Sequence, residues 1–194
     1  DQSPSYSIYT DTSYAESFAM SLQGEGRLLY IATMYPYKWN TTEIDPETMQ
    51  RIERHRAMRA DKGFDTVECY RHVEHIVAKR QDVLLLECMS NLLANEMYLE
   101  PDSNAGSDMA ETMSPVSNKI VQALIDLSTR VQELVIVTND VFSDGGSLTY
   151  DESTREYVKN LAEINCALAR EAATVTEVVC GIPVIVKKNH PMGK

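Results

Sequence analysis

The sequence lacks a surplus of positive charge: its 194 residues contain 18 Lys and Arg against 29 Asp and Glu, a formal net charge of −11. General nucleic-acid binders need such a surplus to neutralise phosphates, so we expect no nucleic-acid partner. Any phosphate ligand must then be held by a local cluster of cations. Long apolar runs are absent too, and none approaches the roughly 20 residues that span a bilayer, so we expect no membrane span.

Cysteine is scarce and lacks metal-binding spacing. Cys69, Cys88, Cys166 and Cys180 form no C-x-x-C pair, and all four fall in apolar stretches. We therefore expect buried thiols in a reducing, cytoplasmic compartment, and neither a zinc site nor a disulfide framework. No linker-like stretch interrupts the chain, whose length fits one domain over residues 1–194.

What the sequence does contain is an alternation of short apolar runs and helical patterns. This alternation predicts an α/β fold with a mainly parallel sheet flanked by helices. The polar stretch 100–114 has no periodicity and is expected to be a mobile loop. The expected strands are 5–10, 28–34, 66–69, 82–89, 134–138 and a terminal pair over 178–186 broken at Gly181-Ile182-Pro183; the expected helices are 13–22, 71–80, 91–99, 151–172 and two that open at Pro46 and Pro115.

Polar residues follow three of the expected strands. Thr33, Glu87 and Asn139 come at or near the ends of otherwise apolar runs. Ligands of parallel sheets bind at the carboxyl ends of the strands. A carboxylate ending a run such as LLLE is where nucleotide-binding α/β proteins hold magnesium or its water shell. An ordinary strand exit explains Glu87 equally well when this residue is taken alone.

The helix that opens at Pro46 carries a histidine among arginines. Arg51, His55 and Arg59 are four residues apart and share one helix face, with Arg56 beside His55. An imidazole flanked by guanidiniums suits contact with phosphate. The alternative is a solvated helix face, which the row taken alone favours by roughly two to one.

Ordered motifs along the chain carry a resemblance to a known family. They are YAES at 14–17, LLYIATM at 28–34, RIERHR at 51–56, TVE at 66–68, LLLECMSNLLANE at 84–96, VIVTNDV at 135–141, LAEINCALA at 161–169 and VVCGIPVIVK at 178–187. In order and spacing they resemble the bifunctional adenosylcobinamide kinase/adenosylcobinamide-phosphate guanylyltransferase family of cobalamin biosynthesis.

The resemblance implies a P-loop NTPase-like (RecA-like) fold, a homotrimer, the nucleotides GTP and ATP, and Mg²⁺. It implies phosphorylation of adenosylcobinamide, followed by transfer of GMP from GTP to adenosylcobinamide phosphate. His55 matches the histidine that carries GMP, and Thr12 and Glu87 match metal-binding positions. The nucleotide-binding positions are then Thr12, Thr33, Arg51, Arg56, Arg59, Glu68, Glu87 and Asn139.

One departure concerns the phosphate loop. The family has a GGxxSGKS loop before YAES, whose backbone N–H groups and lysine hold phosphates. Here residues 5–12 read SYSIYTDT, with Asp11 in place of the lysine and Thr12 as the remaining hydroxyl. Either the chain has lost or rebuilt this loop, or the loop lies outside these residues. The alternative function is therefore a non-catalytic or partially active homologue that binds nucleotide or corrinoid; an unrelated phosphate-binding domain fits fewer of the motifs.

Overall fold

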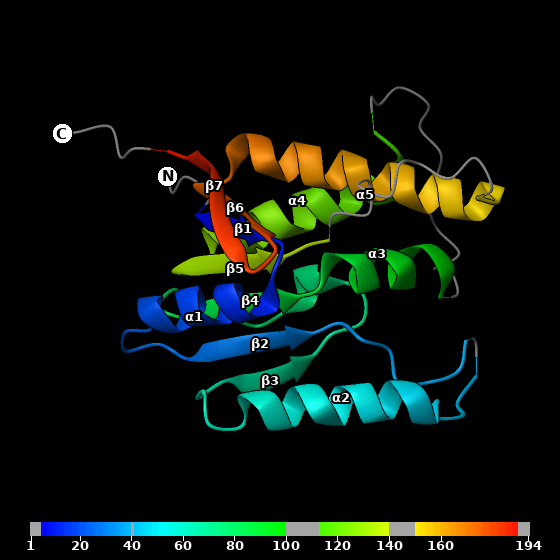
Figure 1. Ribbon diagram of the computed structural model, residues 1–194, viewed down its shortest axis with the longest axis horizontal. Helices are drawn as coiled ribbons and strands as arrows, with labels where there is room; N and C mark the ends of the chain where they lie inside the picture. Colours follow the sequence, from blue (N-terminus) through cyan, green and yellow to red (C-terminus); the bar gives the residue numbers. More distant parts are fainter. Residues whose placement is uncertain (1–4, 40, 100–112, 140–149, 190–194) are drawn as a thin grey trace.

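Strand and helix alternate along the chain, and the strands assemble into one sheet (Figure 1). The computed structural model describes residues 5–39, 41–99, 113–139 and 150–189. Neighbouring strands are parallel except for the final pair, in the order β3-β2-β4-β5-β1-β6-β7. The strands are β1 (Tyr6–Tyr9), β2 (Leu28–Ala32), β3 (Asp65–Glu68), β4 (Val83–Glu87), β5 (Glu133–Val137), β6 (Thr174–Val179) and β7 (Ile182–Lys188).

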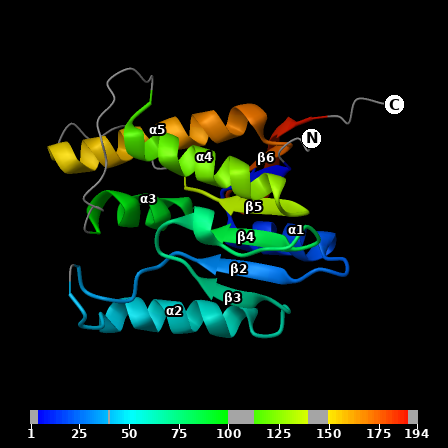
Figure 2. The ribbon, with the colours of Figure 1, turned by 180° about the vertical axis from the view of Figure 1, so that it is seen from behind.

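Helices cover both faces of the sheet (Figures 1 and 2). Helix α1 packs on β4 and β5 from one side, whereas α3, α4 and α5 form a layer on the other, and α2 lies beside the edge strand β3. This arrangement is P-loop NTPase-like and confirms the predicted fold class. No described helix has both the length and the apolar composition that crossing a membrane requires. The helices are α1 (Thr12–Leu22), α2 (Pro46–Arg59), α3 (Met89–Tyr98), α4 (Pro115–Thr129) and α5 (Glu152–Glu171).

The central strand β4 supplies side chains to both layers of the core. Leu84 and Leu86 pack in the cluster on the α3–α5 side, and Leu85 packs with Ala15 and Ala19 of α1 on the other. All three leucines are fully buried, and each contributes about 1.5–3 kcal/mol relative to exposure. A continuous apolar run is thus required here, because both faces of a parallel sheet are covered.

The helix starts are fixed by caps that the sequence contains. Asp45 accepts a hydrogen bond from the Thr48 N–H at 3.2 Å, directly before Pro46 at the first position of α2. Ser114 caps α4 in the same way before Pro115. Proline is tolerated there because the first-turn N–H has no intrahelical partner in any helix. These starts confirm the two proline-initiated helices.

The prediction of a helix over 71–80 is wrong. Only a single 3₁₀ turn, η1 (Val73–His75), forms in this segment. His72 has a left-handed backbone, with φ of 57°, and Ile76 is extended, so an α-helix neither begins before the turn nor continues after it. Val73 and Ile76 lie three residues apart and are both buried, at 1% and 6% exposure. One turn therefore satisfies the apolar positions that suggested a helix.

The expected terminal strand pair forms, but its break is misplaced. The turn is at Cys180 and Gly181, both with positive φ, and Ile182 and Pro183 belong to β7. Strand β6 begins at Thr174, four residues earlier than expected. Proline is accommodated because β7 is an edge strand, where a missing N–H costs no ladder bond.

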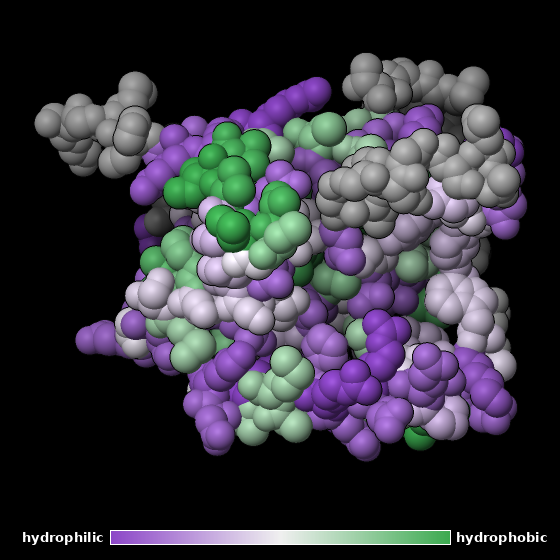
Figure 3. Space-filling view, in the orientation of Figure 1, coloured by the Kyte–Doolittle hydropathy of each residue, from purple (hydrophilic) through white to green (hydrophobic). Residues whose placement is uncertain are grey.

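The hairpin displays an apolar surface, hereafter the hairpin patch, formed by Val179, Ile182, Val184, Ile185 and Val186. Each is between 45% and 65% exposed. Figure 3 shows these hydrophobic side chains gathered over β6 and β7, in contrast to the hydrophilic surface around α2. The strand edge is thus both unpaired and apolar among the described residues.

The four cysteines differ from expectation in their burial. All those described are free thiols; Cys69 and Cys88 are partly buried, but Cys166 and Cys180 are exposed. The prediction of four buried thiols is therefore wrong for two of them. Cys166 lies on the outer side of α5, away from the inner residues Ile164 and Leu168, and Cys180 lies at the hairpin turn. The loop expected over 100–114 lies outside the described residues except for Met113 and Ser114.

A buried carboxylate joins three segments at the amino end of the sheet. Asp82, 1% exposed, accepts hydrogen bonds from the backbone N–H groups of Arg27 and Lys79 and from the Arg27 guanidinium. Its own carbonyl accepts from the Gln132 N–H at 2.9 Å. Burial alone would raise the pKa of the Asp82 carboxyl, but the hydrogen bonds from Arg27 and Lys79 outweigh it and hold the pKa below its ordinary value.

Asp82→Ala should lower the free energy of unfolding by about 2–4 kcal/mol, because the N–H groups of Arg27 and Lys79 lose their acceptor. Urea unfolding at neutral pH measures this. Asp126→Ala, an exposed acid on α4, is the matched control and should change stability by no more than about 0.5 kcal/mol.

The difference should also depend on pH in a defined direction. Because the native pKa of Asp82 is lowered, its stabilisation is complete above the ordinary carboxyl pKa of about 4 and is lost as pH falls through the lowered native value. The free energies of unfolding of wild type and Asp82→Ala should therefore converge as the pH is lowered. Equal stability of wild type and Asp82→Ala at neutral pH would contradict this role.

Candidate active site

Polar side chains gather at the carboxyl ends of β2, β3 and β4. A narrow cleft opens there, between this edge of the sheet and α2. Its volume is about 30 Å³, room for one or two water molecules. The cleft is lined by Tyr30, Ala32, Met34, Ile52, His55, Arg56, Arg59, Glu68, Tyr70 and Glu87.

His55 projects from α2 toward the end of β4. Its side chain is 35% exposed, and its Nδ1 lies 3.7 Å from Oε2 of Glu87, an ion-pair distance that is too long for a hydrogen bond. Burial lowers the pKa of the His55 imidazole below its ordinary value, and Arg59 and Arg51 lower it further. These effects outweigh the opposing influence of the Glu16 carboxylate on the His55 pKa, so the ring is neutral at pH 7 with a lone pair available.

Glu87 joins α1 and α2 to the sheet. Its Oε1 accepts a hydrogen bond from the Thr12 hydroxyl at 3.1 Å, while its Oε2 faces His55. Burial raises the pKa of the Glu87 carboxyl above its ordinary value, and the Thr12 hydrogen bond opposes that rise. The structure thus brings together Thr12, Glu87 and His55, which are far apart in the sequence.

The arginines of the α2 row have three different environments. Arg59 is 5% exposed and stacks on the Tyr30 ring, with its guanidinium carbon 3.7 Å from the ring centre. Arg56 lines the cleft and pairs with Glu68. Arg51 lies instead in a neighbouring groove that includes Trp39. Helix α2 therefore presents two guanidiniums at the cleft, one of them buried against Tyr30, and a third outside it.

Two further predicted residues lie away from the cleft. Thr33 is fully buried; its hydroxyl donates to the Glu87 carbonyl at 2.8 Å and accepts from the Cys88 N–H. It holds the ends of β2 and β4 together and does not line the cleft. Asn139, after β5, accepts a hydrogen bond from Ser90 at 3.3 Å and is exposed. Their predicted nucleotide contacts remain predictions.

No eight-residue phosphate loop lies between β1 and α1. Strand β1 ends at Tyr9 and α1 begins at Thr12, so the connection is Thr10 and Asp11. Asp11 caps the helix by accepting from the Tyr14 N–H at 3.1 Å. A helix N-terminus attracts anions, and here a carboxylate of the chain itself meets that end.

Sequence reasoning missed the aromatic walls of the cleft. Tyr30 supports Arg59 from within β2, and the Tyr70 hydroxyl donates to Glu68 at 2.9 Å. The signal for Tyr30 was weak, since a tyrosine in an apolar strand reads as core. Tyr70 lies two residues after the end of β3, where ligand-binding side chains concentrate, and could have been found on that basis.

Comparison with protein families places the chain in a known group. The model of the family described as cobinamide kinase / cobinamide phosphate guanyltransferase matches residues 11–186. The chain belongs to this family. The match confirms the resemblance and covers Thr12, His55, Glu68 and Glu87, but it begins at Asp11, after most of the stretch where the phosphate loop is expected. A search of curated proteins finds no match to the chain. Family membership makes it a transferase of cobalamin biosynthesis.

Arg51→Gln should raise the pKa of His55, because removing a nearby cation makes the imidazolium less unfavourable. Titration of the His55 ring protons by NMR measures the shift. Arg80→Gln, which removes an exposed arginine outside the α2 row, should leave the His55 titration unchanged. A fall in the His55 pKa after Arg51→Gln would refute this account of the site.

Proposed function

We propose that this family member transfers GMP from GTP to adenosylcobinamide phosphate through His55. The observation that carries the proposal is a neutral imidazole held beside Glu87 at the carboxyl edge of the sheet. Nδ1 is the nitrogen that faces Glu87. A proton on Nδ1 leaves the lone pair on Nε2, which is the nucleophile.

The reaction takes two displacements at the α-phosphorus. Nε2 of His55 forms a bond to this phosphorus, the bond to the bridging oxygen breaks, and pyrophosphate leaves. An oxygen of adenosylcobinamide phosphate then attacks the same phosphorus and the N–P bond breaks, which gives adenosylcobinamide-GDP and restores the neutral imidazole. Arg56 at the cleft, with Arg51 and Arg59 nearby, favours the negative charge that grows on the phosphoryl oxygens.

Mg²⁺ fits the residues at the end of β4 in a limited way. The Thr12 hydroxyl and the Glu87 carboxylate are adjacent oxygen donors, 3.1 Å apart. Mg²⁺ in nucleotide sites takes one or two protein oxygens and completes its shell with phosphate and water. Among the described residues no group of three or more His, Cys, Asp and Glu forms a metal site. Thr12 and Glu87 would hold the ion, which would offset phosphate charge when bound.

Incubation with GTP radiolabelled at the α-phosphate should leave acid-labile label on the protein, and His55→Ala should abolish it because the nucleophile is lost. Label that stays on the denatured protein is covalently bound, and its loss in acid but not in base identifies a phosphoramidate. His75→Ala is the matched control and should label normally. Undiminished label on His55→Ala would rule out this intermediate.

The kinase half of the family activity has weaker support in this chain. Transfer of a γ-phosphoryl group from ATP or GTP depends on a loop lysine and backbone N–H groups that cradle the phosphates. The two-residue connection of Thr10 and Asp11 supplies neither, and Asp11 adds negative charge. This observation favours a partially active homologue that retains guanylyl transfer alone.

Adenosylcobinamide should therefore not be phosphorylated above background with ATP or GTP, whereas supplied adenosylcobinamide phosphate should be converted to adenosylcobinamide-GDP. Chromatography of the corrinoid products measures both. A bifunctional homologue with an intact phosphate loop is the positive control. Phosphorylation at a rate similar to guanylyl transfer would contradict a lost kinase half, and binding of GTP without either turnover would favour the non-catalytic alternative.

The homotrimer and the cytoplasmic location that the sequence suggested remain predictions, as does the domain boundary at 1–194. The hairpin patch is a surface that self-association could cover. Its apolar side chains support assembly but do not specify the number of copies.

A further inference from the structure

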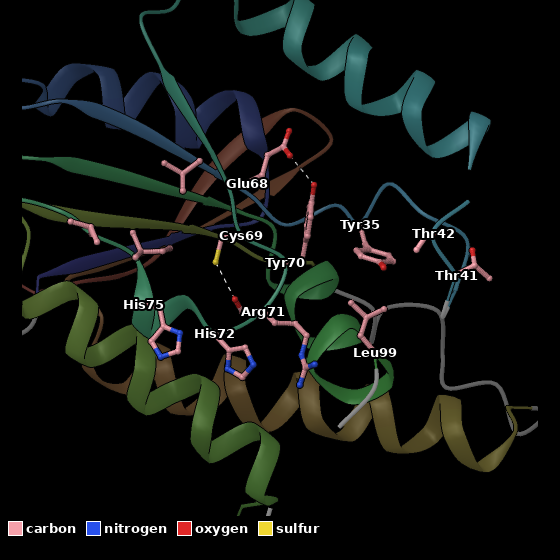
Figure 4. A pocket seen from close by; sticks show the side chains of 13 residues that line it. Tyr35, Thr41, Thr42, Glu68, Cys69, Tyr70, Arg71, His72, His75 and Leu99 are labelled. Atoms are coloured by element: carbon pink, nitrogen blue, oxygen red, sulfur yellow. Dashed lines mark hydrogen bonds between the residues drawn. The ribbon is translucent and has the colours of Figure 1, made fainter. Parts of the chain in front are cut away.

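A second, much larger groove lies beside the His55 cleft. Its volume is about 970 Å³, at the upper end of the roughly 300–1,000 Å³ typical of small-molecule sites. Figure 4 shows its walls: the chain after β2 with Tyr35, Thr41 and Thr42, the end of β3, and Leu99. We call it the β3 groove.

The β3 groove and the His55 cleft meet at the carboxyl end of β3. Glu68 and Tyr70 line both cavities. Successive side chains of a strand point to opposite faces, and Val67 and Cys69 accordingly line only the groove whereas Glu68 reaches the cleft. A ligand in the groove with an arm passing over Glu68 and Tyr70 would reach His55.

The walls of the groove suit a large amphiphile. Tyr35 and Tyr70 form an edge-to-face pair with ring centres 5.4 Å apart. Val77 lines the groove and is 86% exposed, an unusually high exposure for an aliphatic side chain. The Thr42 hydroxyl and the ring of His75 add hydrogen-bonding groups along the same walls, whereas the Thr41 hydroxyl donates to the Lys38 carbonyl and accepts from the Glu43 N–H. Aromatic and aliphatic surface with a few polar groups is typical of sites that bind large small-molecule ligands.

We infer that the β3 groove holds the corrin ring of the acceptor, with its phosphate-bearing arm directed to His55. This inference rests on the proposed guanylyl transfer, since the acceptor must bring its phosphate to the histidine. The His55 cleft, at about 30 Å³, is far too small for a macrocycle, whereas the adjoining groove is large enough and shares two residues with it.

The test separates acceptor binding from formation of the guanylylated protein. Val77→Arg places a long charged side chain across the groove, and Val186→Arg makes the same change on β7, where Val186 is 62% exposed. Both positions are on the surface, so folding should be retained. Three quantities are measured for each variant. The first is labelling of His55 by GTP without acceptor, and the second is transfer of the label from the protein to adenosylcobinamide phosphate. The third is the affinity for adenosylcobinamide, measured by quenching of protein fluorescence.

Val77→Arg should raise the KM for adenosylcobinamide phosphate and the Kd for adenosylcobinamide at least about tenfold while His55 labels at the wild-type rate. Val186→Arg should match wild type in all three. Unchanged KM and Kd in Val77→Arg would overturn the assignment, and slowed labelling by GTP would show that the groove serves the nucleotide instead. If wild type fails to label, guanylyl transfer is refuted, and the corrinoid Kd still decides whether the groove binds the ring.

Discussion

The carboxylate of Glu87 is the interaction on which the site depends. It ends the central strand β4, where both faces of the sheet are covered, so its oxygens must find partners close by. Thr12 from α1 takes one oxygen and His55 from α2 faces the other. Residues from two helices on separate segments thereby meet at one strand end, and the proposed nucleophile His55 faces the same carboxylate that could hold a metal.

The two steps proposed for this family, nucleotidyl transfer and phosphoryl transfer, make different structural demands. Nucleotidyl transfer through a histidine needs a neutral ring and neighbouring cations, which side chains of α2 supply. Phosphoryl transfer needs a run of backbone donors, which a two-residue connection cannot form. The helix end that would attract a phosphate is already satisfied by Asp11. The electrostatics of α1 are thus used within the protein.

The sequence predicts the parts of this molecule that repeat a simple period. Leu84 to Leu86 read as a buried strand because both faces are covered, and Pro46 marks a helix start by its own geometry. The α2 row was also predictable, yet its periodicity could not tell that Arg59 would stack on Tyr30 while Arg51 faced another groove. Those differences come from β2 and β3, which lie elsewhere in the sequence. The prediction of a helix over 71–80 was wrong for a related reason, since one buried turn and one helix give the same spacing of apolar residues.

The hydrogen-bonded Asp82 lies at the end of the sheet opposite the cleft, and this separation has an evolutionary consequence. Arg27 and Lys79, whose backbone N–H groups bind Asp82, line neither the His55 cleft nor the β3 groove. Loops at the carboxyl edge can therefore be shortened or replaced without loss of the anchoring contacts at the other end. A lineage could discard one enzymatic step and keep another while the scaffold stayed intact, a form of modularity within a single sheet.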